Sequence, residues 1–342
     1  MEKIAVLGAG SWGTALAVHL ARKGCRPCLW SHRTGLVEEI LHTRRNSGYL
    51  PQVTIPESVS ASSDLEGIIR NAGVIISAVP SHAFREVISR ARRYFHPDAV
   101  LINAAKGIDE NTRQRISEIY TEISGGNNRN YVALSGPSHA EEVSLGMPTA
   151  VVVASLDGGS AARAQDALMS PEFRVYTNPD VTGVELGGAL KNIIALGTGI
   201  ADGLGFGDNT KAALMTRGLA EIARLGVAMG ASPLTFAGLA GVGDLIVTCT
   251  SMHSRNRRAG IEIGKGRTLE EALAAVRMVV EGVRTTRAAR KLSLHCGVEM
   301  PITEQIYKVL FERKSPREAV FALMGRGKKN EIEDIGLDFK YI

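Results

Sequence analysis

The sequence is poor in the features that mark secreted and metal-binding proteins. Its 342 residues include only four cysteines, and aromatic residues make up 5%. Four cysteines in a chain of this length do not form a disulfide framework. The Cys25–Cys28 spacing has no second cysteine pair that would complete a zinc site. We therefore expect structural cysteines, no bound metal and a cytoplasmic protein.

Long apolar runs and leader sequences are also missing. No stretch of about 20 uninterrupted apolar residues occurs. The nearest candidate, residues 184–206, contains Glu185, Lys191 and Asp202, which is typical of a buried helix and not of a membrane span. Residues 1–7 lead straight into a strand pattern without a cleavage region, so we expect no signal peptide.

The charge balance is only mildly positive. The chain has 40 lysine and arginine residues against 35 acidic residues, a net charge of +5. The basic residues are scattered along the chain and do not form a tail. This balance suits a small anionic substrate at least as well as a nucleic acid, and we expect no nucleic-acid partner.

The strongest motif lies at the start of the chain. A short apolar strand pattern over residues 1–7 is followed by Gly-Ala-Gly-Ser-Trp-Gly and then by a helix pattern. In this context Gly8 takes the tight turn, Gly10 lets the backbone approach a pyrophosphate, and Gly13 lets the helix pack closely on the strand. The helix N-terminus then faces the anion. The motif predicts a dinucleotide site, and the alternative is a tight turn that binds nothing.

The end of the second predicted strand bears on the choice of cofactor. Residues 27–30 form this strand, and Ser31, His32 and Arg33 follow it. At this point NAD-binding folds usually carry an acidic residue for the ribose 2′-hydroxyl. A carboxylate would repel a 2′-phosphate, whereas Arg33 would pair with one. The position favours NADPH without excluding NADH, and the alternative is a solvated arginine at a strand end.

Strands and helices alternate in the first half of the chain. Continuous apolar runs closed by proline, lysine or glycine are typical of parallel strands that are buried on both faces. Such runs cover residues 74–80, 100–105, 131–134 and 150–154, with helix patterns at 84–94 and 116–123. The alternation predicts right-handed crossovers and a doubly wound sheet. Ligands of such sheets bind beyond the carboxyl ends of the strands, where Lys106 and residues 136–138 lie.

From about residue 181 the pattern becomes helical. Helices are predicted over residues 184–203, 211–229, 234–239, 269–280, 284–294, 303–311 and 316–323. We place a domain boundary near residue 180, in agreement with a length that predicts about two domains. This gives a dinucleotide-binding domain over residues 1–180 and a helical substrate-binding and catalytic domain over residues 181–342. The polar end from Arg326 onward is expected to be peripheral.

Two isolated charges mark the candidate catalytic centre. Lys191 and Asp244 each lie in an otherwise apolar stretch. Burying either charge alone is costly, so the simplest arrangement pairs them. Desolvation lowers the pKa of the lysine and the aspartate raises it again, which gives a lysine able to donate and accept a proton. The alternative is a structural ion pair between helices.

A second polar cluster, residues 254–258, precedes a helix pattern. Its hydroxyl, guanidinium and amide donors would suit a phosphate. For Arg257 and Arg258 the alternative is a solvated charged face, and an RNA-binding loop would lack accompanying aromatic residues. Lys106 is a further candidate anion ligand.

With these motifs in hand, the sequence strongly resembles the bacterial NAD(P)-dependent sn-glycerol-3-phosphate dehydrogenase family. The resemblance is carried by residues 8–15, 78–81, 105–108, 134–140, 185–192, 238–245 and 254–256. It implies an α/β N-terminal Rossmann-type doubly wound sheet followed by an all-α C-terminal domain. It also implies reversible reduction of dihydroxyacetone phosphate to sn-glycerol 3-phosphate, the precursor of the phospholipid backbone.

Together with the motifs, the resemblance implies roles for individual residues. Lys191 transfers the proton, Asp244 keeps it placed and charged, and Asn192 and Thr248 would hold the pair by hydrogen bonds. The residues implied at the substrate are Lys106, Gly136, Ser138, Lys191, Asn192, Asp244, Thr248, Ser254, Arg255 and Asn256. The residues implied at the cofactor, NADP or NAD, are Gly8, Gly10, Ser11, Trp12, Gly13, His32, Arg33, Tyr49, Lys106, Ala140, Arg255, Val279 and Glu281. We expect the active site in the cleft between the domains.

Two other functions stay open at this point. A related two-domain reductase of the β-hydroxyacid or ketopantoate type would act on a carboxylate substrate. A non-catalytic nucleotide-sensing protein would bind the cofactor without turnover, but it would have no need of the Lys191–Asp244 pair. The helical domain also allows a homodimer.

Overall fold

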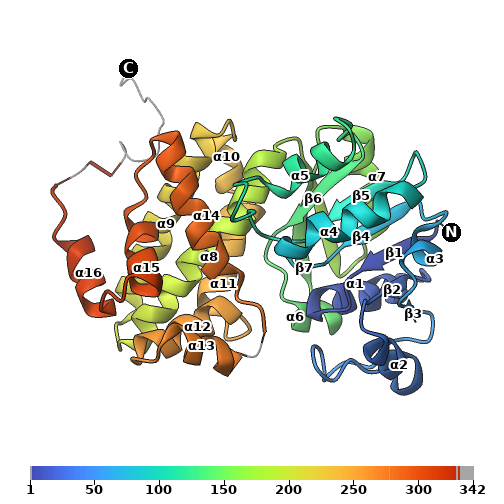
Figure 1. The fold of residues 1–342 in the computed structure, drawn as a ribbon, viewed down its shortest axis with the longest axis horizontal. Helices are drawn as coiled ribbons and strands as arrows, with labels where there is room; N and C mark the ends of the chain where they lie inside the picture. Colours follow the sequence, from blue (N-terminus) through green and yellow to red (C-terminus); the bar gives the residue numbers. More distant parts are fainter. Residues whose placement is uncertain (1, 277, 329, 332–342) are drawn as a thin grey trace. The chain divides into compact units, whose positions relative to one another are not determined.

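The computed structural model describes residues 2–276, 278–328 and 330–331, and the chain forms two compact units (Figure 1). Residues 2–105 and 116–181 make up the first unit. Residues 106–115 pack with the chain from residue 182 onward in the second unit, although they lie within the sequence of the first. Most of the polar end that we expected at the periphery lies outside the described residues.

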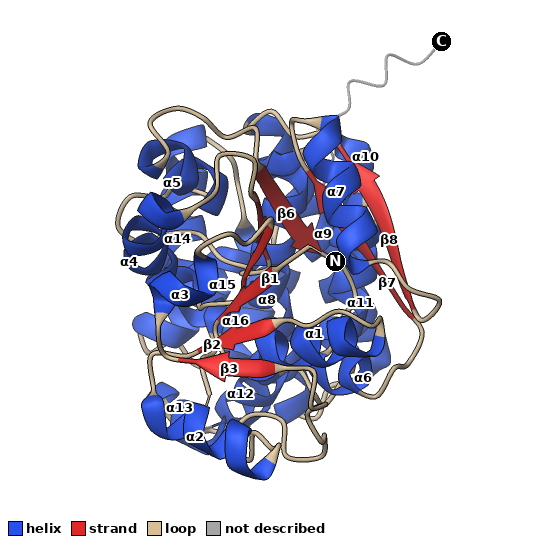
Figure 2. Ribbon diagram, turned by 90° about the vertical axis from the view of Figure 1, so that its right-hand side faces the viewer, coloured by secondary structure: helices blue, strands red, loops and turns tan. Residues whose placement is uncertain are grey.

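The first unit is built on one eight-stranded sheet. Its strands are β1 Ile4–Leu7, β2 Cys28–Trp30, β3 Ser60–Ser62, β4 Val74–Ser77, β5 Val100–Asn103, β6 Tyr131–Ser135, β7 Thr149–Ala154 and β8 Phe173–Asn178. They lie in the order β3-β2-β1-β4-β5-β6-β7-β8, and β1 to β6 are parallel (Figure 2). The predicted doubly wound sheet is confirmed. One difference is that β7 runs antiparallel to β6, and β8 then pairs parallel to β7.

Helices cover both faces of this sheet, which explains why the inner strands β1, β4, β5 and β6 are buried along their whole length. They are α1 Ser11–Arg22, α2 Thr34–Thr43, α3 Leu65–Ile69, α4 Ser81–Ala91, the 3₁₀ turn η1 Arg92–Tyr94, α5 Ile116–Ile123, α6 Ala140–Ser144 and α7 Gly158–Leu168. Figure 2 shows α1 and α6 on one side of the strands and α3 and α4 on the other. The two edge strands, β3 and β8, escaped the sequence analysis because β3 is polar and β8 alternates buried Phe173 and Val175 with exposed residues.

Apart from the segment 106–115, the second unit is all-α, as expected. Its elements are α8 Val181–Gly203, α9 Asp208–Ala228, α10 Pro233–Phe236, the π-helical turn η2 Leu239–Gly243, α11 Asp244–Thr250, α12 Arg255–Gly264, α13 Leu269–Val276, α14 Glu281–Cys296, α15 Pro301–Phe311 and α16 Pro316–Met324. Helix α8 is buried on every side over residues 183–201, so it forms the centre of the unit's core. Helix α11 was not predicted.

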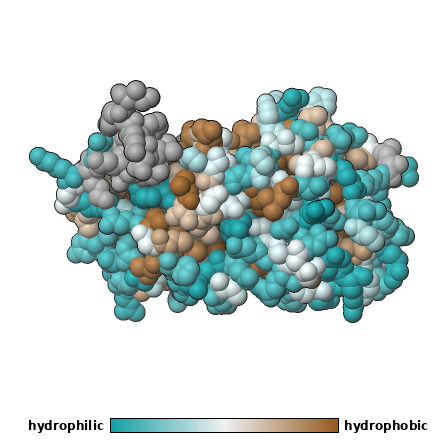
Figure 3. All heavy atoms as spheres, turned by 90° about the horizontal axis from the view of Figure 1, so that it is seen from above, coloured by the Kyte–Doolittle hydropathy of each residue, from teal (hydrophilic) through white to brown (hydrophobic). Residues whose placement is uncertain are grey.

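One stretch of the described chain is long and apolar enough, by length and composition, to cross a membrane. It is Pro233–Thr250 and not the predicted candidate at residues 184–206. The stretch contains α10, η2 and α11 and carries the buried Asp244. A core helix passes the same test, so the stretch is weak evidence for a span. On the face shown in Figure 3, apolar residues form small groups among hydrophilic ones.

A buried carboxylate joins two helices of the second unit. Glu221 of α9 is 2% exposed. It accepts hydrogen bonds from the backbone N–H of Ile302 at 2.6 Å and of Thr303 at 3.2 Å, in the first turn of α15. Burial raises the pKa of Glu221 to about 7, against the effect of these donors. The side chain therefore caps α15 from another helix.

We expect Glu221→Ala to lower the free energy of unfolding by about 1–3 kcal/mol, because it leaves buried N–H groups without an acceptor. Glu221→Gln keeps an acceptor oxygen and should cost less. Denaturant unfolding of both variants measures the difference, and an alanine variant as stable as wild type would contradict the cap.

The same carboxyl gives a pH signature. Its pKa is raised on folding, so its contribution to stability falls as pH rises from about 4.5 toward about 7. Glu221→Gln should remove this part of the pH dependence.

Candidate active site

The glycine turn between β1 and α1 has the geometry that the motif predicts. Gly8 has φ 109°, and a Cβ there would lie 2.9 Å from the backbone of Ala78. A Cβ on Gly13 would lie 1.8 Å from the carbonyl oxygen of Gly8, so the helix can start here only with glycine. A Cβ on Gly10 would meet nothing within 4 Å. The turn is therefore packed at both ends and open at Gly10, as backbone that approaches an anion must be.

Three of the predicted cofactor residues meet beside this turn. The hydroxyl of Ser11 donates to the carbonyl oxygen of Tyr49 at 2.8 Å. The guanidinium of Arg33 donates to the hydroxyl of Tyr49 at 2.5 Å and lies 5.1 Å from the centre of its ring. Arg33 is exposed, and so is His32 next to it. An exposed guanidinium at the end of β2 is free of any carboxylate partner in these contacts and suits a phosphate.

Trp12 lies in the first turn of α1, and three further predicted residues of the first unit follow β6. Gly136 has φ 124° and lies against Val151 of β7. The hydroxyl of Ser138 donates to the carbonyl oxygen of Gly136 at 2.9 Å, and Ala140 begins α6. These residues lie beyond the carboxyl end of a parallel strand, which is the edge where such sheets bind ligands.

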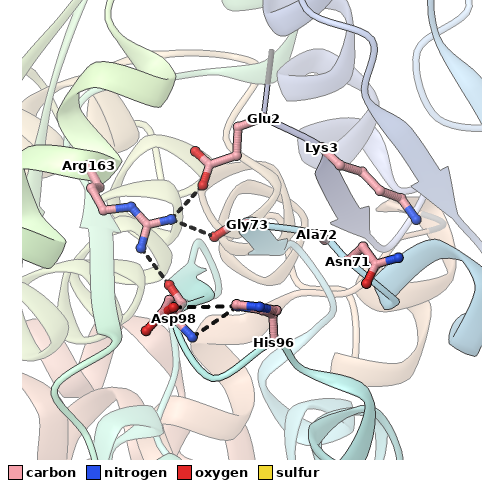
Figure 4. A pocket seen from close by; sticks show the side chains of 8 residues that line it. All are labelled: Glu2, Lys3, Asn71, Ala72, Gly73, His96, Asp98 and Arg163. Atoms are coloured by element: carbon pink, nitrogen blue, oxygen red, sulfur yellow. Dashed lines mark hydrogen bonds and ion pairs between the residues drawn. The ribbon is translucent and has the colours of Figure 1, made fainter.

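A cavity of about 400 Å³ lies at the amino ends of β1, β4 and β5, at the opposite end of the strands (Figure 4). Arg163 of α7 reaches Glu2 at 2.5 Å and the carbonyl oxygen of Gly73 at 3.2 Å. Lys3 donates to the carbonyl oxygens of Gly67 and Arg70. The charged groups of this cavity therefore tie the sheet to its helices, and none of the predicted site residues lies here.

Lys191 and Asp244 form the expected ion pair in the second unit, and Lys106 joins them as a third charged residue. The ammonium of Lys191, on α8, donates to one carboxylate oxygen of Asp244 and to the hydroxyl of Thr248 at 2.7 Å. The ammonium of Lys106 donates to the other carboxylate oxygen of Asp244 at 2.7 Å. The side chains of Lys191 and Asp244 are 7% and 1% exposed, and that of Lys106 is 20% exposed. One buried carboxylate thus bridges two ammonium groups.

These charges set the protonation of the pair. Burial lowers the pKa of Lys191 from 10.5 to about 7, against the attraction of Asp244 and with the repulsion of Lys106. Burial would raise the pKa of Asp244, but the charges of Lys106 and Lys191 outweigh it and hold that pKa below its usual range. Asp244 stays ionised, and Lys191 is able to hold or release a proton near neutral pH.

Close backbone packing brings Asp244 to Lys191. A Cβ on Gly187, one turn before Lys191, would lie 2.5 Å from the carbonyl oxygen of Ala240 in η2. The π-helical turn therefore sits directly on α8, and α11 starts from it with Asp244. Such π-helical turns are frequent at functional sites.

A polar network lies along the next turn of α8. The amide of Asn256 donates to the side-chain oxygen of Asn192 at 2.9 Å, and its own oxygen accepts from the backbone N–H of Gly282 at 2.9 Å. The second hydrogen bond of Asn192 goes to the carbonyl oxygen of Gly188 at 3.5 Å. Asn192 was expected to hold the Lys191–Asp244 pair, but its hydrogen bonds go to these partners, and Thr248 alone of the two holds the pair.

The predicted phosphate cluster lies at the N-terminus of α12. The hydroxyl of Ser254 accepts from the backbone N–H of Arg257 at 3.2 Å and caps the helix, and Arg255 is its first residue. Arg257 itself is held by Asp202 at 2.7 Å, so it is not a solvated charge. Glu281 begins α14 beside Gly282, and Val279, 40% exposed, precedes it.

Sequence reasoning missed part of this centre. It paired Lys191 with Asp244 and assigned Lys106 to the substrate and the cofactor, but it did not place Lys106 on Asp244. It also missed the ion pair of Arg115 with Glu185, at 3.0 Å. Glu185 is charged and lies in the same apolar stretch as Lys191, which was the available signal. Among the described residues no cluster of histidine, cysteine or acidic side chains could hold a metal ion, and all four cysteines are free thiols.

Comparisons with known proteins agree along most of the chain. Two family models match: "NAD-dependent glycerol-3-phosphate dehydrogenase N-terminus" over residues 3–161 and the corresponding C-terminus over residues 180–321. A glycerol-3-phosphate dehydrogenase [NAD(P)+] of Pelotomaculum thermopropionicum is 62% identical over 336 residues, covering 98% of this chain and 96% of the relative.

Solved structures extend this result. Glycerol-3-phosphate dehydrogenase from Coxiella burnetii has a TM-score of 0.91 at 40% identity and covers 95% of this chain and 99% of its own. The enzyme from Saccharomyces cerevisiae has a TM-score of 0.79 at 26% identity, covering 93% and 98%. A ketopantoate reductase from Ralstonia eutropha, at 15% identity and a TM-score of 0.58 over 93% and 99%, shares the fold.

The packing of α12 on α8 gives a test of the site's scaffold. A Cβ on Gly260 would lie 2.2 Å from the carbonyl oxygen of Leu196, so Gly260→Val should force the helices apart and separate Asn256 from Asn192. We expect a loss of about 1–3 kcal/mol of stability. Denaturant unfolding measures it, with Gly207→Ala as the control because a Cβ there meets nothing within 4 Å. Equal stability of the two variants would show that the close contact is not required.

Proposed function

The chain belongs to the NAD-dependent glycerol-3-phosphate dehydrogenase family, and from this premise we propose that it reduces dihydroxyacetone phosphate reversibly to sn-glycerol 3-phosphate with NAD(P)H. The product supplies the backbone of glycerophospholipids. The observation that carries the proposal is the buried Lys191–Asp244–Lys106 cluster, which provides a proton near neutral pH. Such a proton is what reduction of a ketone to an alcohol needs.

In this proposal Lys191 is the catalytic acid. The reduced nicotinamide, when bound, supplies the hydride for C2 of the ketone. The Lys191 ammonium gives a proton to the oxygen on C2, and the neutral amine takes it back in the oxidation. Asp244 orients the ammonium, and the hydroxyl of Thr248 accepts a second hydrogen bond from it, so the proton is aimed from a fixed position.

The N-terminus of α12 is the proposed phosphate site. Its first residues combine backbone N–H groups with the charge of Arg255, and this combination favours an anion. The full proposed substrate set is Lys106, Gly136, Ser138, Lys191, Asn192, Asp244, Thr248, Ser254, Arg255 and Asn256. Gripping the phosphate would orient the carbonyl toward Lys191.

The turn at Gly10 is the proposed site of the cofactor's pyrophosphate, since the backbone there is open. The full proposed cofactor set is Gly8, Gly10, Ser11, Trp12, Gly13, His32, Arg33, Tyr49, Lys106, Ala140, Arg255, Val279 and Glu281. Arg33 supports NADPH, and the name of the relatives, glycerol-3-phosphate dehydrogenase [NAD(P)+], covers both nicotinamide cofactors.

The setting of the enzyme is part of the proposal. Four free thiols fit a reducing compartment, so we propose a cytoplasmic enzyme. Its partners are the phosphorylated triose and the cofactor, without a nucleic acid or a membrane span. A homodimer through the second unit is the assembly to test by sedimentation.

Initial rates with dihydroxyacetone phosphate, ketopantoate and each cofactor test the activity. We expect oxidation of NAD(P)H with the phosphorylated triose only. Lys191→Met should still bind the cofactor but lose about 10²–10⁴-fold in kcat, the contribution of a general acid. A variant that keeps more than about a tenth of the wild-type kcat would remove Lys191 from this role.

The pH dependence of the wild-type enzyme tests the same residue. Reduction needs the ammonium, so kcat/KM for dihydroxyacetone phosphate should fall as pH rises through about 7. Oxidation needs the neutral amine, so its kcat/KM should fall as pH drops through the same value. Profiles that bend in the same direction would contradict the assignment.

Arg33→Ala should raise KM for NADPH by about tenfold or more and leave KM for NADH nearly unchanged, because only NADPH has a 2′-phosphate to pair with the guanidinium. Arg45→Ala, at an exposed arginine of the following loop, is the matched control. Equal losses for the two cofactors would contradict the 2′-phosphate role.

A further inference from the structure

The segment that carries Lys106 is a closed hairpin. Ile108 and Arg115 form an antiparallel bridge, and backbone hydrogen bonds join Asp109 to Gln114 and to Arg113 at 2.9 Å each. The carboxylate of Asp109 also accepts from two backbone N–H groups of the turn, at 3.0 and 2.8 Å. Because the two arms of this hairpin, residues 106–115, are bonded to each other, the position of Arg115 constrains the position of the arm that begins at Lys106.

A buried ion pair anchors this hairpin to the central helix. The guanidinium of Arg115 lies 3.0 Å from the carboxylate of Glu185 on α8, and the two side chains are 14% and 5% exposed. Removing one member of such a pair takes compensation away from the buried charge that remains, which is destabilising locally. A further charged contact of the hairpin, Glu110 with Arg287 at 3.1 Å, is more exposed and contributes little.

Helix α8 also carries the proposed proton donor. Glu185 lies six positions before Lys191, so the two are about 9 Å apart along one rigid axis. Lys106, at the other end of the hairpin, meets Asp244, which meets Lys191. The hairpin is therefore attached to α8 at two points. Arg115 binds Glu185 directly, and Lys106 is linked to Lys191 through Asp244.

We propose that Arg115 and Glu185 are positioning residues of the reaction, which hold Lys106 on the carboxylate of Asp244 and thereby set the charge balance at Lys191. The proposal rests on the proposed role of Lys191 as the proton donor. Neither residue belongs to the substrate or cofactor sets given above. Their effect on the reaction is exerted through Lys106.

The electrostatic consequence has a definite sign. The charged or titratable groups that bear on Lys191 are Asp244 and the thiol of Cys249, both on α11, and Lys106 on the hairpin. Lys106 repels the Lys191 ammonium and also competes for Asp244. If the Arg115–Glu185 contact is lost and Lys106 moves away from Asp244, the repulsion and the competition both disappear. The pKa of Lys191 then rises.

The experiment compares Glu185→Gln and Arg115→Lys with wild type by measuring kcat/KM against pH in both directions. Glu185→Gln should lower kcat by about tenfold or more, since misplaced charges cost rate. It should also move the midpoint of both profiles to higher pH. Arg115→Lys retains the charge and should lie between the glutamine variant and wild type.

Glu221→Gln is the matched control. It changes a buried carboxylate of the same unit to the same amide, but at the cap of α15 and away from the hairpin. If loss of stability alone lowered the rate, Glu221→Gln would show the same loss. The midpoint of its kcat/KM profile against pH should remain that of wild type. A shift in this control equal to that of Glu185→Gln would overturn the proposal.

A double-substitution cycle separates positioning from other effects. Lys106→Met should raise the midpoint by itself, and adding Glu185→Gln to it should produce little further shift, because the group that Glu185 positions is gone. Full additivity, or a wild-type midpoint in a folded Glu185→Gln variant, would refute the inference.

If Glu185→Gln does not fold, the same cycle with Arg115→Lys decides. Failure of the proposed function shows separately, as undiminished turnover by Lys191→Met.

Discussion

The site depends on one carboxylate that is shared between two lysines. Asp244 is almost fully buried, and it is tolerated there because Lys106 and Lys191 each donate to one of its oxygens. The sharing has a chemical consequence. Burial disfavours the charged form of Lys191, and a single carboxylate shared with Lys106 cannot fully offset this, so the pKa of Lys191 is lowered to about 7. A proton that can move in either direction is what a reversible dehydrogenase requires.

Helix α8 fixes the positions of the polar groups of the site relative to one another. One face approaches η2 at Gly187 and brings Asp244 to Lys191. Further along, the α8–α12 contact at Gly260 has no room for a side chain and places Asn256 against Asn192. Because α8 is buried on every side, it has little freedom to shift, and the polar groups that it carries keep fixed separations. The hydrophobic core thus orders the charged centre.

Much of the fold follows from local pattern. The apolar runs at β4, β5 and β6 are long enough to predict buried parallel strands, and several helices of the second unit, such as α14 and α15, have an amphipathic period. The edge strand β8 was not predicted because half of its residues face solvent, and the antiparallel placing of β7 depends on which neighbour it pairs with. Helix α11 is short, follows a π-helical turn and has no separate periodic signal.

By itself the sequence determined the glycine turn, the isolated charges Lys191 and Asp244, and the family that these motifs belong to, because each depends on residue types at fixed spacing. Only the tertiary structure decided that residues 106–115 leave the sheet to pack with the helical unit and bring Lys106 to Asp244. It also decided that Arg115 meets Glu185 across 70 positions of the chain. Such contacts arise from the burial of charge in a three-dimensional core, and no local pattern encodes which distant partner will neutralise it.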